Sequence, residues 1–144
     1  MPTNPSPLIV IGWLEKVAFP SWGIKRIVAK IDTGAKTSSI HAENIVERED
    51  GQIEFDVVTS QSERKKDDKL VHIVTPYIRK TSVRSSSGRA QNRYVVKTVM
   101  TLGGVEKEIE ITLSSRKKML RRVLIGRTTL SGSFIVDVSQ KHIA

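Results

Sequence analysis

The sequence predicts an all-β fold, and three features of the chain support this. Short apolar and β-branched runs recur along its length, with turn residues between them. Gly103 and Gly104 join two alternating runs, which is typical of a two-residue hairpin. Helical structure is expected for at most one turn, at residues 127–130 near the end of the chain. Short strands separated by turn signals favour a sandwich or a barrel.

Alternating or β-branched apolar patterns predict strands in the first half of the chain at residues 8–19, 25–31, 38–46 and 52–59. Pro20 closes the first of these strands, and Gly34 follows the second. Ile27, Ala29 and Ile31 alternate along the second strand and are therefore expected on one of its faces.

The same patterns predict strands in the second half at residues 70–74, 77–83, 93–102, 105–113, 123–125 and 134–138. The charged residues 61–69 that precede them are expected to form a solvated loop. Residues 85–88, Ser-Ser-Ser-Gly, are expected to form a flexible tip between two strands. Residues 123–125 are wholly apolar, which is consistent with a buried strand that ends at Gly126.

Composition bounds the class of protein. A chain of 144 residues is expected to form one domain, spanning residues 1–144, with residues 1–7 as a flexible N-terminal arm. The hydrophobic fraction of 38% and the charged fraction of 27% are ordinary for a globular protein. Because the chain has no cysteine, disulfide scaffolds, thiolate metal sites and thiol nucleophiles are excluded.

Charge narrows the choice of partners without fixing it. The chain carries 24 Lys and Arg against 15 Asp and Glu, a formal charge of +9 that attracts nucleic acid, anionic membrane or acidic polypeptide. Stacking aromatics are scarce, at 5% of the residues, so nucleic acid is not the expected partner. No apolar run is long enough to span a bilayer and no signal peptide is visible. We therefore expect a cytoplasmic protein without a membrane partner, or a periplasmic one if a leader has been removed.

One motif points to chemistry. Asp32, Thr33, Gly34 and Ala35 follow directly after an alternating strand. Asp and Gly are common turn residues, so this stretch alone is compatible with ordinary strand-to-turn punctuation. The alternative is that Asp32 is the carboxylate of an acid–base site.

A second stretch, about ninety residues downstream, favours the chemical interpretation. Leu124, Ile125, Gly126 and Arg127, followed by a small hydrophilic pair and a leucine, resemble the psi-loop segment of retropepsins, the retrovirus-type aspartic peptidases. The order of elements between the two stretches is also similar, and the resemblance covers residues 8–138. It implies a closed retropepsin-like β-barrel, equivalent to half of an acid protease, with a psi-loop.

More narrowly, the chain looks like a bacterial branch of that fold, labelled "ATP-dependent zinc protease" or retropepsin-like endopeptidase. The matching motifs are Gly12-Trp13, Thr37-Ser38, His41-Ala42, the Arg-Ser-Ser-Ser-Gly stretch at residues 84–88, and the Leu-Gly-Gly stretch at residues 102–104.

The resemblance implies an aspartic endopeptidase without a cofactor, in which two carboxylates share one proton and activate water. The chain has a single Asp-Thr-Gly triplet, so each copy supplies half a site and a homodimer is expected. By resemblance, Asp32 is the catalytic carboxylate, Thr33 bonds across the two-fold axis, and Gly34 lets the loop approach the dyad. Ala35 lies beside the substrate.

The resemblance also implies which residues support the catalytic loop and which form a flap over the substrate. Leu124, Ile125, Gly126 and Arg127 support the catalytic loop from the psi-loop. The flap that covers an extended peptide is expected to carry Ser86, Ser87, Gly88 and Arg89.

Two positions depart from the retroviral pattern. Lys36 stands where an acidic residue is common, so Arg127 needs another partner, for which Glu15, Glu43 and the C-terminal carboxylate are candidates. Lys30 stands two residues before Asp32, where an apolar residue is usual.

Two other interpretations remain open. One is a retropepsin-fold module that binds extended peptides without cleaving them. The other is a metal-dependent peptidase, as the label of the branch suggests. No His-Glu-x-x-His motif is present, so His41, with Asp32 or Glu43, is the only metal candidate; it is expected instead to buttress the loop.

Acidic polypeptide is the partner that the charge favours most economically. Genes of the branch that this chain resembles are often found beside ATP-grasp ligases that append glutamates. Together with the charge of +9, this predicts a peptide or protein substrate that is acidic or rich in glutamate.

Overall fold

The computed structural model describes residues 7–60, 69–84, 88, 90–114 and 121–144. In chain order its elements are β1 (Ile9–Gly12), β2 (Leu14–Phe19), a 3-10 turn η1 (Pro20–Trp22), β3 (Ile24–Ile31), β4 (Ser38–His41), β5 (Glu43–Glu47), β6 (Gln52–Ser60), β7 (Lys69–Pro76), β8 (Arg79–Arg84), β9 (Ala90–Leu102), β10 (Val105–Ser114), β11 (Val123–Ile125), α1 (Arg127–Leu130) and β12 (Phe134–Asp137). The predicted all-β class is confirmed, and the single helical turn lies where it was expected.

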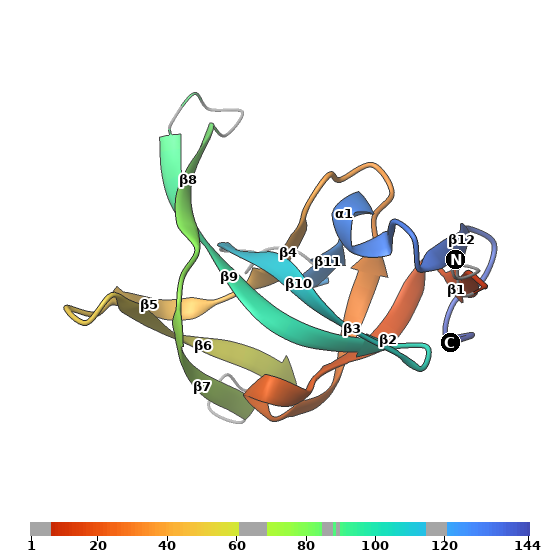
Figure 1. The fold of residues 1–144 in the computed structure, drawn as a ribbon, viewed down its shortest axis with the longest axis horizontal. Coiled ribbons are helices and arrows are strands. Elements are labelled where there is room, and N and C mark those ends of the chain that lie inside the picture. The colour runs from red at the N-terminus through yellow and green to blue at the C-terminus, as the bar shows by residue number, and fades with distance from the viewer. Residues whose placement is uncertain (1–6, 61–68, 85–87, 89, 115–120) are drawn as a thin grey trace, which may run out of the picture.

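A closed barrel of six strands forms the body of the molecule (Figure 1). Its strand order is β10-β4-β11-β3-β2-β9, and antiparallel pairing of β9 with β10 closes the ring. β8 extends the sheet beyond β9, and β5, β6 and β7 form a separate three-stranded sheet. The retropepsin-like barrel inferred from the sequence is therefore the observed architecture.

The core lies inside this barrel, where the alternating side chains of its strands converge. Ile27, Ala29 and Ile31 of β3 are all buried, as their spacing predicts. Trp22 packs edge-on against Phe55 of β6, with ring centroids 5.6 Å apart, and so joins the barrel to the three-stranded sheet.

The hairpin predicted at Gly103 and Gly104 is confirmed. Both glycines have positive φ angles, 57° and 80°, as a primed turn requires. β9 and β10 pair in continuous register from Val105 opposite Leu102 to Thr112 opposite Val95.

Two expected strands are each divided in the structure by a backbone hydrogen bond to another segment. The first divides at Trp13, whose N–H donates to the Gln140 carbonyl over 2.8 Å. The second divides at Ala42, whose N–H donates to the Ser114 carbonyl over 3.0 Å. The predicted loop at 61–69 lies outside the described residues except for Lys69, which begins β7.

A two-stranded parallel sheet of β1 and β12 brings the two ends of the chain together. Beside it, the buried carboxylate of Glu15 accepts the backbone N–H groups of Gly12 at 2.7 Å, Ile143 at 3.2 Å and Ala144 at 3.3 Å. Glu15 thus holds the last residues against the barrel. No helix among the described residues is long and apolar enough to cross a membrane.

Candidate active site

The segment that carries Asp32 is held by backbone hydrogen bonds on both sides. β11 lies between β3 and β4, parallel to β3, so that Ile125 is level with Ile31. The Asp32 N–H donates to the Ile125 carbonyl over 2.8 Å, and the Ile31 N–H donates to the Trp13 carbonyl over 2.8 Å. These bonds fix the point at which the chain leaves β3.

A tight turn orients the Asp32 carboxylate. Its Oδ1 accepts the Gly34 N–H at 3.0 Å, and the Ala35 N–H donates to the Asp32 carbonyl over 3.2 Å. Asp32 is half-buried, whereas Thr33 and Gly34 are exposed. A Cβ atom on Gly34 would lie 3.2 Å from Oδ1, so glycine allows this close approach. The carboxylate therefore stands at the surface with a fixed orientation.

Gly126 packs directly behind this turn. A Cβ atom at this position would collide with the Thr37 carbonyl and lie 2.9 Å from the Ala35 carbonyl oxygen. The next N–H groups continue the contact, because Arg127 donates to Ala35 over 2.8 Å and Thr128 donates to Lys36 over 3.0 Å. Residues 35–37 and the start of α1 thus form one backbone ladder.

A buried polar cluster completes this support, and the sequence did not reveal it. The Ser38 hydroxyl accepts the Gly126 N–H at 3.0 Å and lies 2.7 Å from the Thr129 hydroxyl. Both side chains are buried, so these bonds are shielded from water. Ser38 stood within the Thr37-Ser38 motif, but nothing in the sequence linked it to Thr129, which lies 91 residues away.

Arg127 has a different partner from those expected. Its Nη1 donates to the Thr33 carbonyl over 3.1 Å. Glu15, one of the candidate partners, is occupied by the backbone N–H groups of the terminal segments. Arg127 bonds to this carbonyl because α1 lies against the Asp32 loop, which places the Thr33 carbonyl within reach of the guanidinium.

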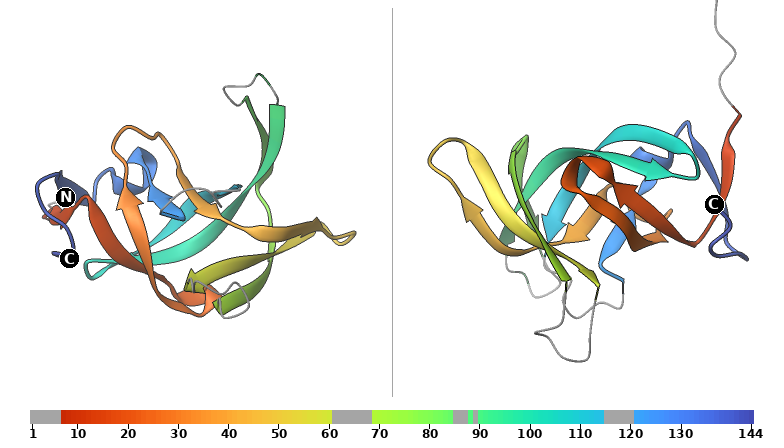
Figure 2. Two further views of the ribbon diagram at one scale, coloured as in Figure 1. Left: turned by 180° about the vertical axis from the view of Figure 1, so that it is seen from behind. Right: turned by 90° about the horizontal axis from the view of Figure 1, so that it is seen from below.

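The side of the barrel that carries the Asp32 segment also carries the β8–β9 hairpin, which stands away from the barrel (Figures 1 and 2). Of the expected flap residues, Gly88 is described and has a φ of 81°, which suits glycine. Ser86, Ser87 and Arg89 lie outside the described residues.

The root of the hairpin, which we define as Tyr77, Lys80 and Tyr94, is tied to Glu47 of β5. The Glu47 carboxylate accepts the Tyr77 hydroxyl at 2.8 Å, the Tyr94 hydroxyl at 2.9 Å, and the Lys80 ammonium at 2.9 Å. Hydrogen bonding from Lys80, and then from the two tyrosines, holds the pKa of Glu47 below its ordinary value. The bond to Glu47 raises the pKa of Lys80 and of Tyr77.

The described residues do not fit a zinc centre. No group of three or more His, Cys, Asp or Glu side chains gathers among them in a way that could hold a metal ion. His41 is buried, and its Nε2 lies 3.1 Å from Glu43 Oε1. One histidine beside one carboxylate falls short of the four-ligand tetrahedral set that zinc prefers.

Comparisons with known proteins identify a family model and a solved structure that resemble this chain. A family model described as "RimB-like: Retropepsin-like aspartic endopeptidase RimB" matches residues 10–144. In crystals, the protein Lpg0085 of unknown function from Legionella pneumophila has the same fold, with a TM-score of 0.74 and 27% identity, covering 94% of this chain and 97% of that one.

Curated relatives carry a different name. The "Probable alpha-L-glutamate ligase" of Shewanella pealeana is 37% identical over 134 residues, which cover 91% of this chain and 29% of that protein. The protein of the same name from Desulfotalea psychrophila is 38% identical over 131 residues, covering 89% and 28%. The chain therefore spans less than a third of the length of these relatives. From the match of residues 10–144 to the family model, the chain belongs to the RimB-like family of retropepsin-like aspartic endopeptidases.

Proposed function

We propose that the chain is an aspartic endopeptidase whose active site forms when two copies bring their Asp32 carboxylates together. The observation that carries this proposal is the Asp32 turn. It presents one half-buried carboxylate at the surface: the backbone N–H of Asp32 donates to the Ile125 carbonyl, and Oδ1 of its carboxylate accepts the Gly34 N–H. One such triplet per chain supplies half of a dyad.

Chemistry at such a dyad follows from the repulsion of two close carboxylates, which leads them to share one proton. The ionised member takes a proton from a bound water molecule as the water attacks the scissile carbonyl carbon. The protonated member donates a hydrogen bond to the carbonyl oxygen, where negative charge develops. When the tetrahedral intermediate collapses, the C–N bond breaks, and the carboxyl group that took the proton from water gives it to the leaving amine nitrogen. The Gly34 N–H keeps each carboxylate oriented during this exchange of roles.

The loops beside the dyad have defined parts in this proposal. Arg127 holds the Thr33 carbonyl, which leaves the exposed Thr33 side chain available to contact its twin across the axis. The β8–β9 hairpin covers an extended substrate and excludes water. Ala35 is small enough to lie beside the substrate backbone.

An acidic polypeptide is the substrate that we propose. The formal charge of +9 favours encounter with acidic chains. The name of the curated relatives, probable alpha-L-glutamate ligase, supports a connection with glutamate.

Replacing the proposed catalytic carboxylate tests the hydrolysis. The Asp32→Asn chain should retain its fold and lose cleavage of acidic peptides. A peptide mimic with a hydroxyl in place of the scissile carbonyl should inhibit the unaltered chain. Full cleavage by Asp32→Asn would refute the proposal.

A second candidate, a peptide-binding module without hydrolysis, is favoured by one specific observation. The curated relatives are named as ligases, and this chain matches less than a third of their length, as an attached module would. The same variant separates the two candidates. A module would show no hydrolysis in either form and would keep its affinity for peptides after Asp32→Asn.

A further inference from the structure

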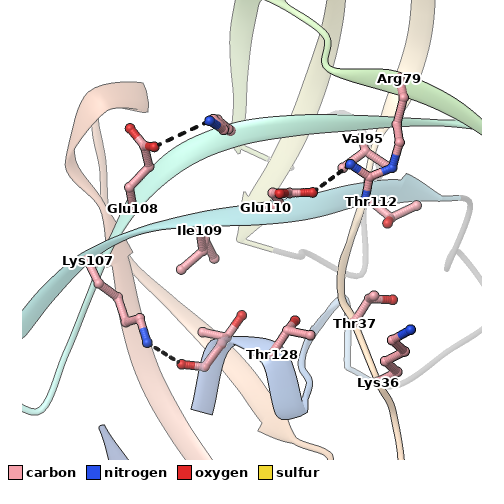
Figure 3. Close-up of a pocket in the computed structure, with 12 residues that line it drawn as sticks. Lys36, Thr37, Arg79, Val95, Lys107, Glu108, Ile109, Glu110, Thr112 and Thr128 are labelled. Atoms are coloured by element: carbon pink, nitrogen blue, oxygen red, sulfur yellow. Dashed lines mark hydrogen bonds and ion pairs between the residues drawn. The ribbon is translucent and has the colours of Figure 1, made fainter. Parts of the chain in front are cut away.

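An open cavity of about 570 Å³ lies beside the Asp32 segment, between β10 and α1 (Figure 3). It exists because β10 pairs with β4 only from Ile111 to Ser114. The preceding part of β10 has β9 on one side and the cavity on the other. Ile109 points into the cavity from β10, and Thr37 and Thr128 lie across from it (Figure 3).

The ionic groups of the lining are unbalanced in favour of positive charge. The cavity is lined by four cationic side chains and two carboxylates, and both carboxylates are already paired. Arg79 Nη1 lies 2.8 Å from Glu110 Oε1, and Lys97 Nζ lies 3.7 Å from Glu108 Oε1. The remaining two cations are lysines, for which no ion pair occurs within the described part of the chain.

Lys107 is the first of these two lysines. Its Nζ donates to the Thr129 carbonyl over 2.7 Å and lies 3.1 Å from the Ser133 hydroxyl, and its side chain is half-buried. Both of these partners are neutral, so they satisfy hydrogen bonds without cancelling the charge. A half-buried charge with neutral partners raises the affinity of its surroundings for an anion.

Lys36 is the second, and it connects the cavity to the proposed catalytic loop. It is exposed, lies four residues after Asp32, and has its carbonyl bonded to the Thr128 N–H. Four residues span at most about 14 Å, even in a fully extended chain. Since an extended peptide advances about 3.3 Å per residue, this distance corresponds to about four residues of substrate.

We propose that this cavity is a carboxylate-binding subsite and that Lys36 is its specificity-determining residue. The ligand is the side-chain carboxylate of an extended acidic peptide. Lys36 binds the carboxylate, the hydroxyls of Thr37 and Thr128 donate to it, and Ile109 contacts its aliphatic stem. That the bound carboxylate lies within about four residues of the cleaved bond rests on the proposed function. The binding of the carboxylate in the cavity does not.

The test measures binding in the Asp32→Asn background, so that cleavage cannot interfere. The probes are fluorescein-labelled hexaglutamate and hexaglutamine, both amidated at the C-terminus so that only side chains supply carboxylates. Fluorescence anisotropy is measured at low and at physiological salt. Lys36→Gln is compared with Lys25→Gln, which removes an equal charge from an exposed position outside the cavity lining.

The subsite predicts that Lys36→Gln weakens hexaglutamate binding by about three- to ten-fold, as expected for loss of a charge-assisted contact. Lys25→Gln should change it less than about two-fold, since its effect is only long-range and screened. Neither variant should alter hexaglutamine binding. Equal losses in the two variants would overturn the subsite, because they would reflect the net charge alone.

Failure of this proposal can be told apart from failure of the proposed function. If the unaltered chain binds hexaglutamate through Lys36 but cleaves no acidic peptide, the subsite stands and the peptidase falls. If the chain cleaves acidic peptides equally well with and without Lys36, the subsite falls and the peptidase stands. A free C-terminal carboxylate as the true ligand would appear as binding of a non-amidated hexaglutamine, and that result would also overturn the proposal.

Discussion

The Asp32 segment and the root of the β8–β9 hairpin are fastened by different kinds of bond. Asp32 is held by backbone hydrogen bonds, and the Ser38 and Thr129 hydroxyls behind it are buried. The hairpin root is held by the Glu47 carboxylate, whose side chain keeps 38% of its surface exposed.

Burial decides how costly each set of bonds is to break. A buried donor or acceptor that loses its partner bears the full cost of desolvation, whereas an exposed one bonds to water instead. We therefore expect the Asp32 segment and the backbone ladder behind it, which together we call the Asp32 platform, to be rigid. The angle between the β8–β9 hairpin and the barrel should change at a small cost in free energy. A peptidase needs this division, because its catalytic carboxylate must be fixed while its cover opens for substrate.

The largest effect is expected from filling the space behind the platform. Gly126→Ala places a methyl group against the carbonyls of Thr37 and Ala35, which cannot move without breaking the backbone ladder. Such overpacking against fixed backbone should lower the free energy of unfolding by about 3 kcal/mol or more. Urea unfolding measures this loss.

Gly51→Ala is the matched control for Gly126→Ala. Nothing lies near a Cβ atom at Gly51, but its φ of 80° is unfavourable for alanine. That substitution should cost about 1–2 kcal/mol. Equal losses in the two variants would contradict the close packing at Gly126.

A smaller effect is expected from Ser38→Ala. This change leaves the Gly126 N–H and the Thr129 hydroxyl without their partner in a buried place, which should cost about 2 kcal/mol. Thermal unfolding of the variant measures the loss. Ser39→Ala, next along β4 and only partly buried, should change stability by less than about 0.5 kcal/mol. If Ser39→Ala proved as damaging as Ser38→Ala, the buried cluster would not be the support that we describe.

The smallest effect, confined to the hairpin, is expected from Glu47→Gln. Because the pKa of Glu47 is lowered in the folded chain from an ordinary value of 4.5, its contribution is present above pH 4.5 and is lost as the pH falls through the lowered value. Hydrogen-exchange protection factors of β8 should therefore fall on acidification in the unaltered chain.

Comparison of variants isolates the role of Glu47 in this response. In Glu47→Gln the protection of β8 should be lower and should not vary with pH in that window. Glu106→Gln, an exposed glutamate on β10, should behave like the unaltered chain. An identical acid response in Glu47→Gln would show that another group controls the hairpin. At alkaline pH the pH dependence has the opposite direction. The pKa of Tyr77 is raised in the folded chain, so the stability that its hydrogen bond to Glu47 contributes is lost as the pH rises.

Local sequence patterns were sufficient to predict most of the strands. They were not sufficient to predict contacts between residues that are far apart in the sequence. The β9–β10 hairpin and the strand at Val123–Ile125 follow from alternation, paired glycines and a short apolar run. The breaks at Trp13 and Ala42 depend on carbonyls of Gln140 and Ser114, which no local pattern reveals.

The candidate site shows the same limit. Asp32 and Gly126 could be singled out from the sequence because each lies in a short motif of consecutive residues. Ser38 with Thr129, and Arg127 with the Thr33 carbonyl, are pairs separated by more than 90 residues. Their proximity is a product of the barrel closure, as is the cavity beside Lys36.

Subunit mixing tests the central claim, that a single Asp32 is active only beside its twin, most directly. A fixed amount of the unaltered chain is mixed with Asp32→Asn chain, allowed to exchange, and assayed on an acidic peptide. If two Asp32 residues form each site, an equal amount of the variant should reduce activity to about half, and an excess should abolish it. Activity that stays unchanged at every ratio would contradict the account, because each chain would then be acting alone.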